Sequence, residues 1–131
     1  MIRRTLLYPL VAIALVVPAA VLVGKDPEQT QDASKEMLEA AREGYALQVQ
    51  ARQAGQSRGP GHQWSERILR AERLVAKTDD QRRDAAKQHL ERMKNLLEVE
   101  TKLYESQEVG RLAVVEAQFH VAEAKQLLAE N

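Results

Sequence analysis

Three side chains near the carboxyl terminus have the types and the spacing of a metal-binding stripe. Glu116, His120 and Glu123 stand at i, i+4 and i+7 of a predicted helix, so they lie on one face. Carboxylate and imidazole groups are ligands for divalent transition metals. One helix supplies too few ligands for a closed site, and no second His–Glu pair at matching spacing is apparent. The favoured interpretation is a solvated border beside an apolar seam, and we predict no metal and no cofactor.

The other residue types that carry chemistry point away from catalysis. His89 lies on an apolar seam, where we expect it to pack, and His62 lies in a Gly-Pro loop. The chain has no cysteine, which removes disulfides, thiolate metal sites and cysteine nucleophiles. The serines fall at loops or helix starts, where serine caps helices: Ser34, Ser57, Ser65 and Ser106. We therefore expect a protein that is not an enzyme.

Charge and composition limit the function further. The 19 basic and 19 acidic residues balance, so the chain lacks the basic surface that holds nucleic acid, and we expect no nucleic-acid partner. Aromatic residues make up 4% of the chain, so the core must be built from Ala, Leu, Val, Ile and Met. Such a core suits thin helix-on-helix packing better than a thick interior.

The first 25 residues have the pattern of a targeting segment. Residues 1–4 contain two arginines and residues 6–24 carry no charge, which is typical of a secretory signal, either cleaved or retained as an anchor. Retention leaves the chain anchored in the inner membrane through residues 6–24, with its domain on the periplasmic side. Cleavage releases the domain into the periplasm. Both alternatives predict an exported protein.

Helical periodicity predicts an all-α domain over residues 33–131. We expect a polar tether at 26–32 and helices at about 33–53, 62–105 and 111–130, with Asp32 as the first N-cap. Their short connections give antiparallel neighbours, so the predicted fold is a three-helix, antiparallel, coiled-coil-like hairpin. Apolar and small residues define its interaction seam, which consists of Trp64, Ile68, Val75, Leu90, Met93, Leu97, Tyr104, Val114, Ala117, Val121 and Ala124.

Two features of the long middle helix stay open. The seam turns polar at residues 78–83, and Thr78 with Gln81 has the spacing of a capping box, which marks a helix start. No glycine or proline interrupts the segment and the period resumes in phase, so a continuous helix is favoured. Trp64 is either an exposed anchor for a partner or a plug that covers the end of the bundle, and the plug is favoured.

Residues 103–117 resemble a recurring pattern of TolC-like outer-membrane efflux proteins. The pattern's turn glycine falls at Gln107 here, its small helix-starting polar residue at Gly110 and its usual aspartate near Ala113. The chain has no room for the membrane strands and paired hairpins of a TolC-like channel. The resemblance therefore implies a helical packing module and not a pore. The positions that match the pattern are Tyr104, Val114, Ala117, Val121 and Ala124.

Residues 37–130 are also similar to a group of exported bacterial helical proteins. The shared stretches lie at residues 64–67, 76–78 and 89–93, and the same module from tyrosine to alanine follows them. This similarity implies a helical fold and an exported location. It brings no assigned chemistry.

Two functions fit these patterns. The first is a non-enzymatic structural or interaction protein of the cell envelope, which pairs in coiled-coil fashion with a second copy or with another helical envelope protein. The alternative is a periplasmic helical module that binds metal or unfolded chains, motivated by the Glu116–His120–Glu123 face and the apolar row between Leu90 and Leu97. The first is preferred, because the monomer has few large apolar residues to bury.

Overall fold

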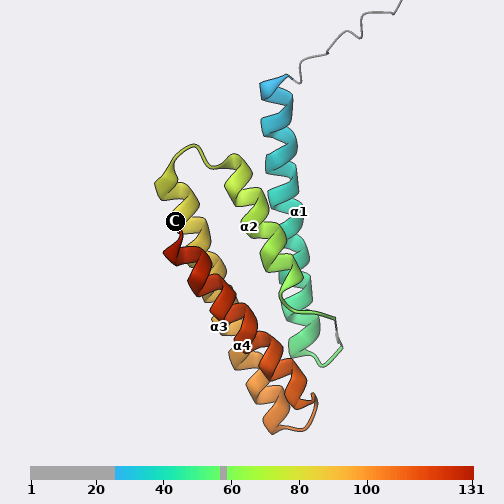
Figure 1. Cartoon of the computed structure of the whole chain (residues 1–131). Helices are drawn as coiled ribbons and strands as arrows, with labels where there is room; N and C mark the ends of the chain where they lie inside the picture. The colour runs from blue at the N-terminus through green and yellow to red at the C-terminus, as the bar shows by residue number, and fades with distance from the viewer. Residues whose placement is uncertain (1–25, 57–58) are drawn as a thin grey trace, which may run out of the picture.

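The computed structural model describes residues 26–56 and 59–131, and in this part of the chain the only regular elements are four helices. They are α1 (Pro27–Gln53), α2 (Gln63–Val75), α3 (Asp79–Glu105) and α4 (Arg111–Ala129) (Figure 1). The all-α class is therefore confirmed. The predicted leader, residues 1–25, lies outside the described residues.

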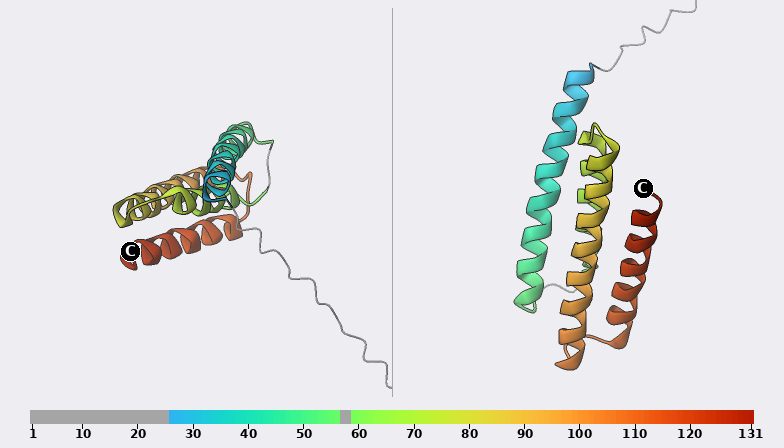
Figure 2. Two further views of the ribbon diagram at one scale, coloured as in Figure 1. Left: turned by 90° about the horizontal axis from the view of Figure 1, so that it is seen from above. Right: turned by 90° about the vertical axis from the view of Figure 1, so that its left-hand side faces the viewer.

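The helices form two antiparallel hairpins, α1 with α2 and α3 with α4, joined where α2 packs on α3. Seen from two further directions, α1 and α4 lie on opposite sides of the pair formed by α2 and α3 (Figure 2). This layering leaves α4 with one neighbouring helix, α3, on its inner side. Its outer side has no helical neighbour among the described residues.

The first helix begins earlier than the sequence analysis predicted. Residues 27–32, expected as a polar tether, form the first turns of α1, and the N-cap is Asp26 instead of Asp32. The Asp26 carboxylate accepts a hydrogen bond from the Glu28 amide at 3.1 Å, and Pro27 occupies the first helical position, where its missing N–H costs nothing. The Asp-Pro-Glu sequence thus begins a helix, although its polar composition had indicated a tether.

The predicted long helix over 62–105 is wrong, because it breaks between Val75 and Asp79. Thr78 caps α3: its hydroxyl accepts from the Gln81 amide at 3.2 Å, and the Gln81 side chain accepts from the Thr78 amide at 3.3 Å. Asp79 and Asp80 then lie in the first turn, where carboxylates favour a helix N-terminus. This capping box starts a new helix although no glycine or proline interrupts the segment, so the domain has four helices instead of three.

The core between α3 and α4 lies where the predicted return helix was expected to pack. Leu90 and Met93 of α3 form one buried cluster with Val121 and Ala124 of α4, and the partly buried Leu96, Leu97 and Leu128 pack against it. Most predicted seam residues are buried or half-buried. Tyr104 is the exception, with 41% of its surface exposed, because it lies in the last turn of α3, where the seam ends.

The turn from α3 to α4 contains a backbone conformation that L-residues rarely adopt. Gln107 has φ +62°, in the left-handed region, and the Glu108 amide closes the turn by donating to the Leu103 carbonyl at 2.8 Å. This is the position where the TolC-like pattern has a glycine. Glycine adopts this region without steric cost, whereas glutamine does not.

We therefore expect Gln107→Gly to stabilise the fold by about 0.5–1 kcal/mol, because it relieves the left-handed strain. Gln107→Ala keeps a Cβ and serves as the matched control, with little change expected. Urea denaturation of the full chain and both variants measures the difference. An equal effect of glycine and alanine would show that the backbone at residue 107 is not strained.

Candidate functional site

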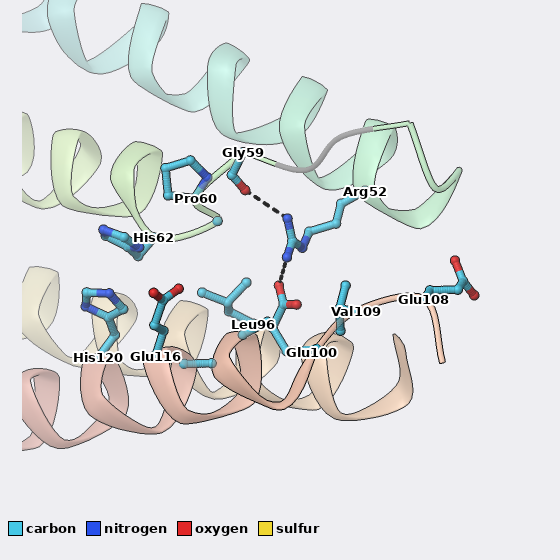
Figure 3. A pocket seen from close by; sticks show the side chains of 14 residues that line it. Arg52, Gly59, Pro60, His62, Leu96, Glu100, Glu108, Val109, Glu116 and His120 are labelled. Carbon is cyan, nitrogen blue, oxygen red and sulfur yellow. Dashed lines mark hydrogen bonds and ion pairs between the residues drawn. The ribbon is translucent and has the colours of Figure 1, made fainter. Parts of the chain in front are cut away.

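An open pocket of about 440 Å³ lies where the ends of three helices and the loop before α2 meet (Figure 3). Arg52 enters it from the last turn of α1, and Glu100 enters from α3. His62 reaches it from the start of α2, while Glu116 and His120 line it from α4. Tertiary packing thus brings one pair of opposite charges, a further glutamate and two imidazoles, from three helices and a loop, to the walls of one pocket.

The deepest part of this pocket is a buried ion pair between Arg52 and Glu100. Their side chains are 11% and 2% exposed, and the Arg52 guanidinium also donates to the Gly59 carbonyl at 2.9 Å. Among residues 26–56 and 59–131, nothing forms a hydrogen bond with the second carboxylate oxygen of Glu100 or with the Nε of Arg52. A buried pair of this kind fixes how α1 sits against α3, although its incomplete hydrogen bonding reduces its net stabilisation.

Two imidazole rings meet beside the ion pair. The rings of His62 and His120 stack with centroids 3.7 Å apart and planes 24° apart. His62 Nε2 lies 3.9 Å from a Glu66 oxygen, and His120 Nδ1 lies 3.0 Å from a Glu123 oxygen. Burial lowers the pKa of His62, with the neighbouring His120 adding to the shift, while Glu66, Glu116 and Glu123 oppose it. The neutral form of the imidazole is thereby favoured.

Only one half of this cluster, the pair on α4, was predicted from the sequence. His120 and Glu123 are neighbours, as the helical spacing of α4 predicted, whereas Glu116 lies along the pocket wall. His62 and Glu66 are a second His–Glu pair at i, i+4. This pair was not predicted because the sequence places His62 in the Gly-Pro loop. In the structure His62 directly precedes the first turn of α2, so it shares a face with Glu66. The signal that could have found it is the spacing itself.

A second polar cluster lies in the interior, at the centre of the α2–α3 contact. The fully buried Ser65 hydroxyl accepts from Arg92 Nε at 2.8 Å and lies 2.9 Å from His89 Nδ1. Arg92 also pairs with Glu72 at 3.4 Å, and Glu72 pairs with Arg42 of α1 at 3.3 Å. Ser65 was expected to cap a helix, but it is the buried centre of a network that links three helices and reaches the surface at Arg42.

This network makes a pH dependence measurable. Burial lowers the pKa of His89 from 6.5 to about 4, and the Arg92 charge adds to the shift. The Ser65 hydrogen bond opposes it, and the more distant His120 and Glu123 lower and raise the pKa respectively. As the pH falls, His89 takes up a proton near pH 6.5 in the unfolded chain but only near pH 4 in the folded chain. Its contribution to the free energy of unfolding is therefore fully present above pH 6.5 and is lost as the pH falls towards 4.

We expect the free energy of unfolding to decrease by about 1–3 kcal/mol between pH 6.5 and 4 on account of His89, after allowance for solvent screening. His89→Gln keeps a polar side chain but cannot titrate, so its stability should depend less on pH, leaving the smaller contribution of His62. Urea denaturation at stepped pH values measures both slopes. Identical slopes in the wild type and in His89→Gln would contradict the assignment.

The burial of Trp64 is intermediate between the two alternatives left open by the sequence, an exposed anchor for a partner and a plug that covers the end of the bundle. Its ring is half-buried against α1, so close to Gly44 that a Cβ at that position would lie 2.5 Å from the ring. The Arg67 guanidinium covers the ring, 4.2 Å from its centroid. Trp64 thus packs inside the α1–α2 hairpin.

The outer face of α4 is apolar although no other part of the chain that the structure describes covers it. Leu112 is 69% exposed, Val115 46% and Phe119 59%, and the exposed Ala122 continues the row at the same spacing of three and four. This row lies opposite the inner face, where Ala117, Val121 and Ala124 pack on α3. Other exposed apolar side chains, such as Met37 and Leu47 on α1 and Leu74 on α2, are scattered singly, which is ordinary for a protein surface.

No helix within residues 26–56 and 59–131 combines the length and the apolar character needed to cross a membrane. Comparison of the chain with protein-family models, with curated proteins and with solved structures gives no match. The resemblance to TolC-like proteins therefore stays a prediction from sequence. What the molecule does must be argued from its own surfaces.

Proposed function

We propose that this chain is an exported, non-enzymatic interaction protein of the cell envelope that pairs with a second copy of itself through the outer face of α4. The observation that carries the proposal is the exposed apolar row of Leu112, Val115, Phe119 and Ala122. Side chains in this 3-4-3 spacing are the a and d positions of a coiled coil, which are stable when a partner helix covers them.

The charges beside the row support a second copy in parallel orientation. Residues on one border, at the e positions, are acidic: Glu116, Glu123 and Glu130. Residues on the other border, at the g positions, are Arg111, Gln118 and Lys125, and all six are exposed. In a parallel pair each g residue faces the e residue of the other copy, five positions on. Opposite charges then meet in two of the three pairs, and the neutral Gln118 faces a glutamate in the third.

An antiparallel pair would place like borders together, and glutamates would face glutamates. That arrangement is disfavoured by charge repulsion. The parallel pair also places a Gln126 side chain from each copy at one a position, where a polar residue helps to fix register and two-stranded pairing. The charge pattern thus favours an in-register, two-fold pair.

A parallel pair fits an envelope location. Both copies then present their amino-terminal ends on the same side, as two chains attached to one membrane through residues 6–24 must do. The α4 row is short, so the pair is expected to be weak in solution. Anchoring in one membrane raises the effective concentration of the two faces and favours pairing.

Sedimentation of the full chain in mild detergent, over a range of concentrations, tests the proposal. We expect a monomer–dimer equilibrium in the wild type and a monomer in Phe119→Glu, because a buried unpaired charge opposes pairing. Leu47→Glu on α1 is the matched control, since Leu47 and Phe119 are both 59% exposed. A wild-type monomer at every concentration, or a dimer that persists in Phe119→Glu, would overturn pairing through α4.

A further inference from the structure

We propose that His62, Glu66 and His120 form a binding site for one divalent transition-metal ion of the zinc type. One ligand atom from each of these residues lies within 4.8 Å of those of the other two. The three residues come from two different helices, which supplies the second ligand set that one helix alone lacks. None of the three ligands belongs to the outer row of α4 or to its e and g borders, so the site does not require pairing.

The donor set fits zinc and its neighbours in the first transition row. Two imidazoles and one carboxylate are the three protein ligands of many open zinc sites, in which water takes the fourth position. Ligand atoms around tetrahedral zinc lie about 3.3 Å apart, given bonds of roughly 2.0 Å. The three side chains are intermediate or exposed in burial, so rotation about their side-chain bonds can bring the donor atoms from their present spacing to that distance.

The Glu123 carboxylate orients one of the three ligands, His120. Its carboxylate can only accept a hydrogen bond, so the His120 Nδ1 at 3.0 Å must carry the proton and donate it. The neutral His120 ring then keeps its free electron pair on Nε2, the other nitrogen. A carboxylate that orients a metal-ligating imidazole in this way is the usual outer partner of zinc-bound histidine.

The surroundings allow an ion to enter and to stay hydrated. His62 and His120 both line the open pocket, whose other walls include Glu116 and the loop at residues 59–61. Both imidazoles are only partly buried, so water and a hydrated ion can reach them. A bound ion would tie the start of α2 to α4 and therefore stabilise the folded chain in proportion to its concentration.

Titration of the full chain with Zn²⁺, followed by calorimetry and by the rise in melting temperature, tests the site. We expect one ion per chain. His62→Gln and His120→Gln should each weaken binding about 10-fold or more, because each leaves two protein ligands. Glu123→Gln should weaken it in the same direction while leaving all three ligands in place.

His89→Gln is the matched control, because the third histidine of the chain is buried outside the cluster and should leave zinc affinity unchanged. Co²⁺ gives an independent readout, since a tetrahedral site produces visible absorption that His62→Gln should abolish. Absence of binding at millimolar zinc would overturn the proposal. So would equal affinity in the wild type and in both ligand variants, or an equal loss in His89→Gln.

Discussion

Glu100→Ala should destabilise the domain by about 3–5 kcal/mol, the cost of leaving one buried charge without its partner. The Arg52 guanidinium, 11% exposed, would keep the Gly59 carbonyl but lose the buried carboxylate with which it pairs. A loss of this size is a large part of the stability of a small domain. Urea denaturation of the full chain, followed by circular dichroism, measures it.

Two further variants separate the charge from the loss of side-chain volume. Arg52→Met with Glu100→Leu removes both charges, and we expect it to recover most of the stability, because an apolar pair avoids the desolvation of both ions. Glu98→Ala on the same helix breaks a fully exposed pair with Lys102 and should have no measurable effect. If the double variant were as unstable as Glu100→Ala, packing and not charge would explain the loss.

Gly44→Ala should destabilise the domain by about 1–3 kcal/mol, although alanine is the better helix former at an interior position. Its Cβ would lie 2.5–2.7 Å from three ring carbons of Trp64, so the ring must move. The Arg67 guanidinium on that ring hinders such a shift. The glycine is therefore required by the close approach of α1 and α2.

The sign of the Gly44 substitution should reverse when the ring is absent. In a Trp64→Ala background, Gly44→Ala meets no obstacle and should stabilise the domain by up to about 1 kcal/mol through helix propensity alone. Denaturation of the four proteins in this cycle measures the coupling. A Gly44→Ala effect of the same sign in both backgrounds would mean that Trp64 does not set the cost.

Local patterns in the sequence predicted the helical class and the inner face of α4. Ala117, Val121 and Ala124 are buried because their spacing of three and four matches the helical period, which is set by the chain itself. The break at Thr78 shows the limit of this reasoning. The sequence contains both a capping box, which favours a new helix, and an uninterrupted apolar period, which favours one continuous helix. Which of them prevails depends on the tertiary packing of α2 and α3.

The candidate site was less accessible to sequence because it is made by tertiary contacts. Arg52 and Glu100 are 48 positions apart in the sequence, and nothing in their local patterns marks either as buried. His62 and His120 meet only because α2 and α4 both pack on α3. The outer row of α4 is visible in the sequence as well, but periodicity alone does not show which of the two opposite apolar faces of a helix packs on the domain.

Cysteine crosslinking tests whether two copies of this chain pair in parallel through the outer face of α4. The chain has no cysteine, so single cysteines introduced as Val115→Cys and Ala122→Cys report without background. An in-register parallel pair places each d residue beside its own counterpart, close enough for a disulfide. We therefore expect both variants of the full chain to form disulfide-linked dimers under mild oxidation, and Leu47→Cys on α1 to stay monomeric. An antiparallel pair would crosslink at one of the two α4 positions at most, and an absence of crosslinking at both would contradict pairing through this face.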